Sequence, residues 1–270
     1  MPHLWLRVAV AFYAVGLVYA LVALTRGTEL LQRIALPAMR VGMLFHFVSL
    51  TEAVLLSGPA LTSVHNSESL LALMIMVVFM IAYVRYRTLS PGIVVFPLVF
   101  LLTFVSSFGQ QPFLFTSEGL RTGWLVAHIA LIFTGYAALV LSFGASLLYL
   151  VQERNLKSKK PGGILSRLPA LETIDEIGYR SLLLGFPFMT LGLLAGSVVA
   201  QQRFGPAYFL DSKVLLSLLM WAVYMIMLYT RWSSGWRGRR AAYLATFAFA
   251  AAVLAWAANY FSGVHRFISS

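Results

Sequence analysis

Long apolar runs separated by short polar turns dominate the chain. A helix needs ~20 apolar residues to cross ~30 Å of hydrocarbon, and eight runs meet this length. These runs lie near residues 4–25, 36–57, 69–86, 91–109, 122–151, 181–201, 213–231 and 240–262. The pattern predicts an all-α, polytopic membrane protein with eight transmembrane helices, of which the fifth projects beyond the bilayer.

The distribution of positive charge orients these helices. Of the 20 lysines and arginines, 15 fall in or beside the loops that follow the first, third, fifth and seventh runs. An excess of Lys and Arg marks cytoplasmic loops, so both termini are expected on the outer, extracytoplasmic side. The net charge of +11 in a chain with only 11% charged residues is explained by these loops, and no nucleic-acid partner is expected.

Residues 1–270 are interpreted as a single membrane domain with one long basic cytoplasmic loop, 152–180. In the second half of this loop, apolar residues recur at helical spacing, which predicts a short interfacial helix. These residues are Leu168, Leu171, Ile174 and Ile177. The chain has no cysteine, which excludes disulfides, thiolate metal sites and a thiol nucleophile.

Polar side chains within hydrocarbon are costly, so each is a candidate for function. His46 lies near the midplane of the second run and either hydrogen-bonds a neighbouring helix or ligates a metal or heme. His128 and His265 lie near the outer ends of the fifth and eighth runs, on the same face of the membrane. Two neutral imidazoles can hold heme iron. Zinc would need a further ligand, such as Asp211, and the two histidines can also be unrelated.

Two other polar residues have ordinary explanations. Glu52, in the outer third of the second run, is expected to pair with an outer arginine, although a proton route is the alternative. Tyr229, near the cytoplasmic end of the seventh run, is interpreted as a residue of the interfacial aromatic belt.

Several motifs together point to a known family. The stretch RFGPAYFLDSK at 203–213 separates the sixth and seventh runs, and GWRGRRAA at 235–242 follows the seventh. VHNSESL at 64–70, GWLVAH at 123–128 and FSGVH at 261–265 occupy outer positions. Together these motifs resemble those of the CcsA/HemX branch of the cytochrome c assembly family, the heme-handling proteins with a tryptophan-rich "WWD" outer loop.

The resemblance is degenerate in that outer loop, 202–213. Gly205, Asp211 and Lys213 stand at the family spacing of WGxxWxWDxK. The three tryptophan positions hold Phe204, Tyr208 and Leu210 instead. A second departure is Tyr229, which stands where CcsA proteins carry a histidine.

The resemblance implies a non-covalent, b-type heme whose iron is bound by His128 and His265. It implies no catalytic residue, and a heme lyase or cytochrome c synthase system in which the chain is one part. The implied partners are a CcsB/ResB-type membrane protein and apocytochrome c, and the implied location is the cell's inner (plasma) membrane. The residues expected to bind the cofactor are His128, His265, Phe204, Gly205, Tyr208, Asp211, Lys213 and His46.

The predicted function is therefore to hold or deliver heme at the outer face for attachment to apocytochrome c. Two alternatives stay open. One is a HemX-like membrane regulator of tetrapyrrole biosynthesis that binds a cytoplasmic partner through its basic loop. The other is an accessory subunit of a larger membrane complex.

Overall fold

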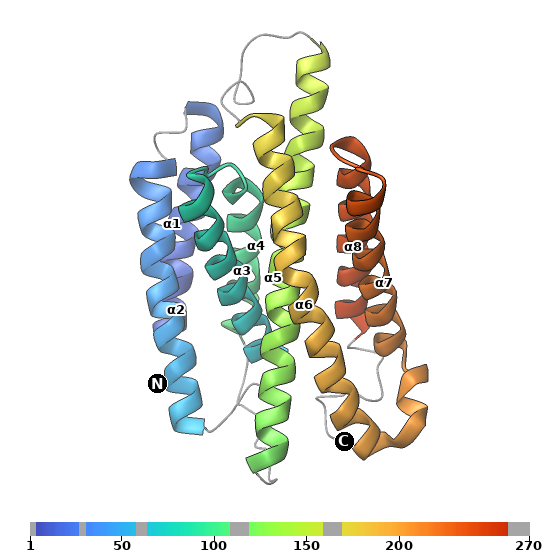
Figure 1. Ribbon diagram of the computed structural model, residues 1–270. Coiled ribbons are helices and arrows are strands. Elements are labelled where there is room, and N and C mark those ends of the chain that lie inside the picture. The colour runs from blue at the N-terminus through green and yellow to red at the C-terminus, as the bar shows by residue number, and fades with distance from the viewer. Residues whose placement is uncertain (1–3, 27–30, 58–63, 109–118, 159–168, 259–270) are drawn as a thin grey trace.

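The computed structural model describes residues 4–26, 31–57, 64–108, 119–158 and 169–258. Within these ranges every regular element is a helix, as the apolar runs predict, and eight α-helices form one elongated bundle (Figure 1). Their bounds are α1 Leu4–Arg26, α2 Leu36–Ser57, α3 Val64–Tyr86, α4 Gly92–Ser106, α5 Gly119–Ser158, α6 Leu171–Phe204, α7 Ser212–Ser233 and α8 Arg239–Ala257. A π-helical segment, η1 Leu31–Ala35, precedes α2, and a 3₁₀-helix, η3 Gly205–Leu210, joins α6 to α7.

The interior is filled by two clusters of buried apolar side chains on either side of α5 and α6. The first joins α1, α2, α3 and α4 to these two helices and includes Phe79 and Phe96, whose rings meet edge to face at 5.1 Å. The second joins α7 and α8 to them and includes Met220 and Tyr224. Long helices α5 and α6 therefore form the centre of the bundle (Figure 1).

Small residues let α5 and α6 approach closely. A Cβ added at Gly185 of α6 would come within 2.7 Å of the Ala138 methyl of α5. Small side chains at such a seam are the usual means by which membrane helices pack, because lipid offers no hydrophobic driving force between them. The register of α5 against α6, which places His128, is set by this seam.

Seven of the described helices are long and apolar enough to cross a membrane, and they account for seven of the eight predicted spans. The fourth, α4, is apolar but has only 15 residues, where 91–109 was expected. At 1.5 Å per residue it is ~22 Å long, which is short of the hydrocarbon thickness. Helix α5, with 40 residues, extends past its neighbours as predicted (Figure 1).

The described parts of the basic loop 152–180 are almost entirely helical. Helix α5 continues through Ser158, and α6 begins at Leu171 and runs without a break into the sixth predicted span. The prediction of a separate interfacial helix is wrong, because Ile174 and Ile177 are buried in the protein core and do not face a membrane surface. The helical spacing was correct, but its apolar face packs against other helices.

The two ends of the bundle differ in charge. The last residues of α3, α5 and α7 lie at one end, and the first residue of α1, the last residue of α8 and η3 lie at the other (Figure 1). The described basic residues near the first end include Arg85, Arg87, Arg154, Lys157, Arg180, Arg237, Arg239 and Arg240. We call this the basic end, and the opposite one the η3 end. The alternation of charge seen in the sequence thus corresponds to the two ends of the fold.

Candidate functional site

His128 lies on the face of α5 that packs against α6, about two and a half turns from the η3 end of its helix. Its Nδ1 is 2.6 Å from the carbonyl oxygen of Gly192. A carbonyl oxygen can only accept, so Nδ1 carries the proton and the neutral ring has its lone pair on Nε2. No described residue hydrogen-bonds Nε2. Metal-ligating histidines are commonly held in this way, with one ring nitrogen donating to a backbone carbonyl.

The ring of His128 fits a notch made by two glycines of α6, four residues apart. A Cβ added at Gly196 would lie 2.5 Å from Cε1 of His128 and 2.6 Å from its Nδ1. A Cβ at Gly192 would lie 2.8 Å from the Ile132 side chain, one turn along α5. Any side chain larger than hydrogen at Gly196 would displace the imidazole. The resemblance identified His128 but not the two glycines that form its notch. The four-residue spacing of Gly192 and Gly196 is the sequence feature that could have indicated them.

The segment between α6 and α7, expected to be an outer loop, forms the 3₁₀-helix η3. Phe204 is the last residue of α6 and Gly205 the first of η3. The side chain of Tyr208 is buried and its ring stands 4.1 Å from that of Phe209, whereas Leu210 is 79% exposed. Tyr208 and Leu210, at two of the three positions where the family has tryptophan, therefore do not share one surface, since Tyr208 is buried and Leu210 is exposed. The Tyr208 hydroxyl is buried and has no hydrogen-bond partner among the described residues.

Asp211 begins α7. It is the N-cap residue, and its Oδ1 accepts a hydrogen bond from the backbone N–H of Lys213 at 3.0 Å. A carboxylate is favoured there because it satisfies one of the free N–H groups of the first turn and complements the helix dipole. The side chain of Lys213, in the first turn of α7, is partly buried. The 202–213 segment and the beginning of α5, the helix that carries His128, lie at the same end of the bundle (Figure 1).

His265 lies outside the described residues, so its position is not tested. Helix α8 is capped by Ala258 at the η3 end (Figure 1). The seven residues from Ala258 to His265 reach at most ~25 Å. The described residues contain no cluster of three or more His, Asp or Glu side chains that could hold a metal ion.

His46 has a different environment from His128. Its side chain is fully buried between α1, α2 and α3. The hydroxyl of Tyr13 lies 3.3 Å from its Nδ1, and the hydroxyl of Ser69 lies 2.7 Å from its Nε2. The Tyr13 and His46 rings also meet edge to face. Both nitrogens are engaged in this arrangement, so an iron could bind His46 only after one of these hydroxyls moved away.

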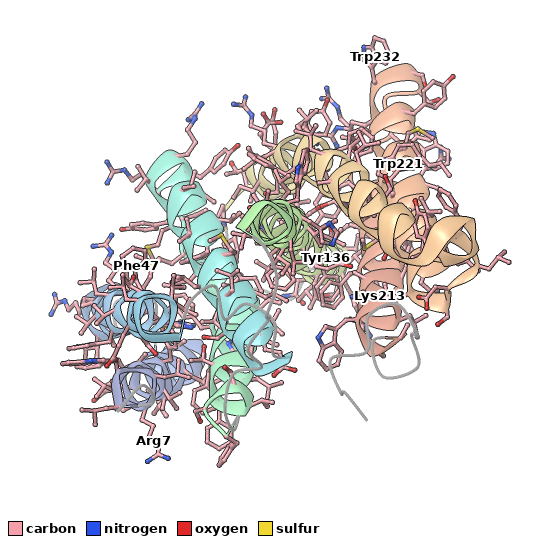
Figure 2. The ribbon with its side chains drawn as sticks, turned by 90° about the horizontal axis from the view of Figure 1, so that it is seen from below. Arg7, Phe47, Tyr136, Lys213, Trp221 and Trp232 are labelled. Carbon is pink, nitrogen blue, oxygen red and sulfur yellow. The ribbon has the colours of Figure 1, made fainter. Side chains whose placement is uncertain are left out.

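Tyr229 is on the opposite side of the molecule from His46. It is 62% exposed on α7, as expected of an interfacial aromatic residue. Seen from the η3 end, Phe47, next to His46 in sequence, lies at one side of the bundle, and Trp221 and Trp232 of α7 lie at the other (Figure 2). Tyr136 of α5 lies between them (Figure 2). In this fold His46 and Tyr229 do not line a common site.

Sequence reasoning missed a polar cluster at the basic end. The carboxylate of Asp175, on α6, accepts from Arg231 Nη2 of α7 at 2.7 Å and from the backbone N–H of Gly238 at 3.0 Å. The Arg231 guanidinium also lies over the Tyr179 ring, 4.5 Å from its centroid. Gly238 has φ +64 and sits against Tyr149, where a side chain would not fit. We call these five residues the Asp175 clamp. The clamp holds the GWRGRR turn against α6. In the sequence, only the acidic Asp175 within LETIDEIGYR hinted at it.

Comparison with known proteins agrees with the motifs. A family model described as "Cytochrome C assembly protein" matches residues 5–265, which is nearly the whole chain. The match includes His128, the 202–213 segment and His265.

Individual relatives are more distant. The cytochrome c biogenesis protein CcsA of Heterosigma akashiwo (strain NIES-293 / 8280G21-1) is 27% identical over 219 residues, covering 67% of this chain and 68% of that protein. The cytochrome c biogenesis protein CcsA of Chlamydomonas reinhardtii is 34% identical over 132 residues, covering 48% of this chain and 36% of that protein. That of Prochlorococcus marinus (strain MIT 9215) is 32% identical over 164 residues, covering 54% and 53%. The last two matches thus span about half or less of the relatives' own length.

Proposed function

Because the chain belongs to the cytochrome c assembly protein family, we propose that it holds heme at the outer face of a membrane and delivers it for attachment to apocytochrome c. The seat of His128 is the observation that supports this most. The Gly192 carbonyl fixes the Nδ1–H tautomer, which leaves Nε2 able to ligate iron. The relatives' names as cytochrome c biogenesis proteins are consistent with this role, and they favour it over the regulatory and accessory alternatives.

In this proposal heme is cargo, bound without a covalent bond. His128, near the η3 end of α5, and His265, which lies outside the described residues, would ligate the iron. Lys213, in the first turn of α7 next to η3, would pair with a propionate. The buried hydroxyl of Tyr208, which has no described partner, offers a hydrogen bond to the bound molecule. The chain has no cysteine, so it cannot form a thioether with heme and the binding is of b type.

The heme supplies the vinyl groups to which the cysteines of the apocytochrome add, and the protein contributes orientation and protection of the iron. The 202–213 segment has lost its tryptophans, and Tyr208 faces inward. Phe204 and Gly205 would therefore support the site through the backbone turn from α6 into η3, and Asp211 through the cap of α7. His46 is the remaining mid-membrane imidazole and would bind heme only in a conformation that releases Tyr13 or Ser69.

The proposed partner is a CcsB/ResB-type membrane protein, and the proposed location is the inner (plasma) membrane as a multi-pass protein. With eight crossings and the η3 end outside, as we propose, an exported apocytochrome would reach His128 and the 202–213 segment. A thiol reductant for the apocytochrome must come from another protein, because this chain has no thiol.

The test is the heme content of the purified protein. Produced together with a ResB-type protein, it should show a Soret band that His128→Ala and His265→Ala each remove or strongly reduce. His65→Ala, in the first turn of α3 at a histidine that the proposal does not use, is the matched control and should retain the band. A protein that never carries heme, or whose heme survives both substitutions, would disprove the proposal.

A further inference from the structure

An open hollow of about 420 Å³ lies on the exposed surface of the α1–α2 pair, and the heme proposal makes no use of it. Phe47, one of its lining residues, lies at the side of the bundle opposite to Lys213 and Trp232 (Figure 2). The hollow is therefore separate from the His128 site. Its lining residues are Trp5, Phe47, Val48, Thr51, Glu52 and Leu55.

The hollow has the shape of a helix-packing groove. Phe47, Thr51 and Leu55 are spaced four residues apart on α2 and form one ridge, and Val48 and Glu52 form the next. Ridges of this spacing accept the complementary ridges of another helix. The wall on the α1 side is preformed, because the Trp5 ring stacks on Phe45 of α2 at 5.6 Å with an angle of 9°.

The lining is apolar except for one carboxyl group. Oε2 of Glu52 is shielded from solvent and has no hydrogen-bond partner among the described residues. The Thr51 hydroxyl donates to the Phe47 carbonyl oxygen at 2.9 Å, so it does not serve Glu52. An acidic side chain within a membrane-spanning segment is costly unless a donor or a positive charge meets it.

The arginine partner expected from the sequence is not found in the described part of the chain. Arg7 of α1 is exposed and points away from the side of the pair that carries Phe47 (Figure 2). Around the hollow the surface is apolar and open, with Leu55 79% and Phe47 61% exposed. Glu52 is thus an acid on a lipid-facing groove for which the described chain supplies no counter-ion.

We propose that this groove is the docking site for a membrane-spanning helix of the partner protein, and that this helix brings a lysine or arginine onto Glu52. The inference rests on the proposed function, because it assumes that the chain works with a second membrane protein. A basic side chain in a membrane helix is itself costly, so the pair satisfies both groups at once. A lipid acyl chain would fill the apolar ridges but would leave the carboxyl group without a donor.

Site-specific cross-linking tests the docking site. A photo-reactive amino acid replaces Leu55, which lines the groove, in cells that also produce the ResB-type protein. The matched control replaces Leu219, which is 48% exposed on α7. The cross-linked product is expected to contain the ResB-type protein when the probe is at position 55 and not when it is at position 219.

The role of Glu52 is tested in the same cells. Glu52→Gln keeps the side-chain shape and should lower the cross-linking yield at position 55 by about tenfold, the loss expected for one charge-assisted contact. Glu153→Gln, at an acid that pairs with Lys157 on α5, is the matched control and should leave the yield unchanged. An undiminished yield in Glu52→Gln overturns the charge pairing.

Other occupants give distinct results. Cross-linking of the chain to itself at position 55 would identify a second copy as the occupant, and adducts with lipid alone would show an ordinary lipid-facing groove. Either result overturns the proposal. The Soret band is read on the same samples. A protein without heme that still cross-links through Glu52 would contradict the heme-holding function while upholding the docking site, so the two failures are distinguishable.

Discussion

At the scale of residues, the two described histidines of the membrane-spanning helices have opposite surroundings. Both ring nitrogens of His46 are engaged by hydroxyl groups, and the ring is fully buried. His128 has one nitrogen fixed by the Gly192 carbonyl and the other without a described partner. A histidine fixed on one side only is prepared to bind a ligand, whereas one fixed on both sides joins helices.

The glycine notch gives a prediction for a single residue. Gly196→Ala places a methyl group within 2.6 Å of two atoms of the His128 ring, so the ring must move and its bond to Gly192 is lost. Overpacking of this kind costs ~1–3 kcal/mol, and the displaced ligand should also lower heme content and shift the Soret maximum. Gly123→Ala is the control on α5, because nothing lies within 4 Å of its added Cβ. An unchanged spectrum and melting temperature in Gly196→Ala would contradict the packing of the His128 ring against Gly196.

At the scale of elements, the sequence predicted the helices well and their contacts poorly. The second run, 36–57, coincides with α2, and the seventh differs from α7 by at most two residues. These boundaries follow from apolar length, which is local information. The extension of α6 back to Leu171 was missed because an apolar stripe does not reveal whether it faces a membrane surface or a helix. The pairing of His128 with Gly192 and Gly196 depends on the α5–α6 register, which no local pattern encodes.

The Asp175 clamp connects elements that are distant in sequence, and its removal should destabilise the basic end. Arg231 and Asp175 are only 9% and 15% exposed at their side chains. Asp175→Asn keeps an acceptor for the Gly238 N–H but leaves the arginine without its counter-charge, which for a buried pair costs ~3–5 kcal/mol. Thermal unfolding of the protein in detergent should show a clear drop in melting temperature.

The neighbouring residue provides the control for the clamp. Glu176 pairs with Arg180 on the exposed surface of the same helix, with the two side chains 36% and 53% exposed. Exposed pairs contribute less than ~1 kcal/mol, so Glu176→Gln should melt close to the parent protein. Equal effects of Asp175→Asn and Glu176→Gln would mean that the clamp does not carry the expected energy.

At the scale of the whole molecule, the two ends of the bundle carry different groups of residues, and so do its two sides. The η3 end carries His128 and the start of α7, and the basic end carries the clamp and most of the arginines. Across the bundle, the α5–α7 side holds the proposed heme site and the α1–α2 side the proposed docking groove (Figure 2). A partner bound at α1–α2 would therefore leave the heme site open to an apocytochrome.

This arrangement requires the η3 end to face outward, and the absence of cysteine makes the orientation directly measurable. Leu210→Cys, at an exposed position of η3, should react with a membrane-impermeant maleimide in intact cells. Arg237→Cys, in the exposed turn before α8, and Arg87→Cys, between α3 and α4, should react only after permeabilisation. Arg87 and Arg237 both lie at the basic end, so they should be labelled from the same side; labelling from opposite sides would mean that the short helix α4 does not cross and would contradict the described bundle. Labelling of Leu210→Cys from the cytoplasm would reverse the orientation and remove the proposed site from the reach of an exported apocytochrome.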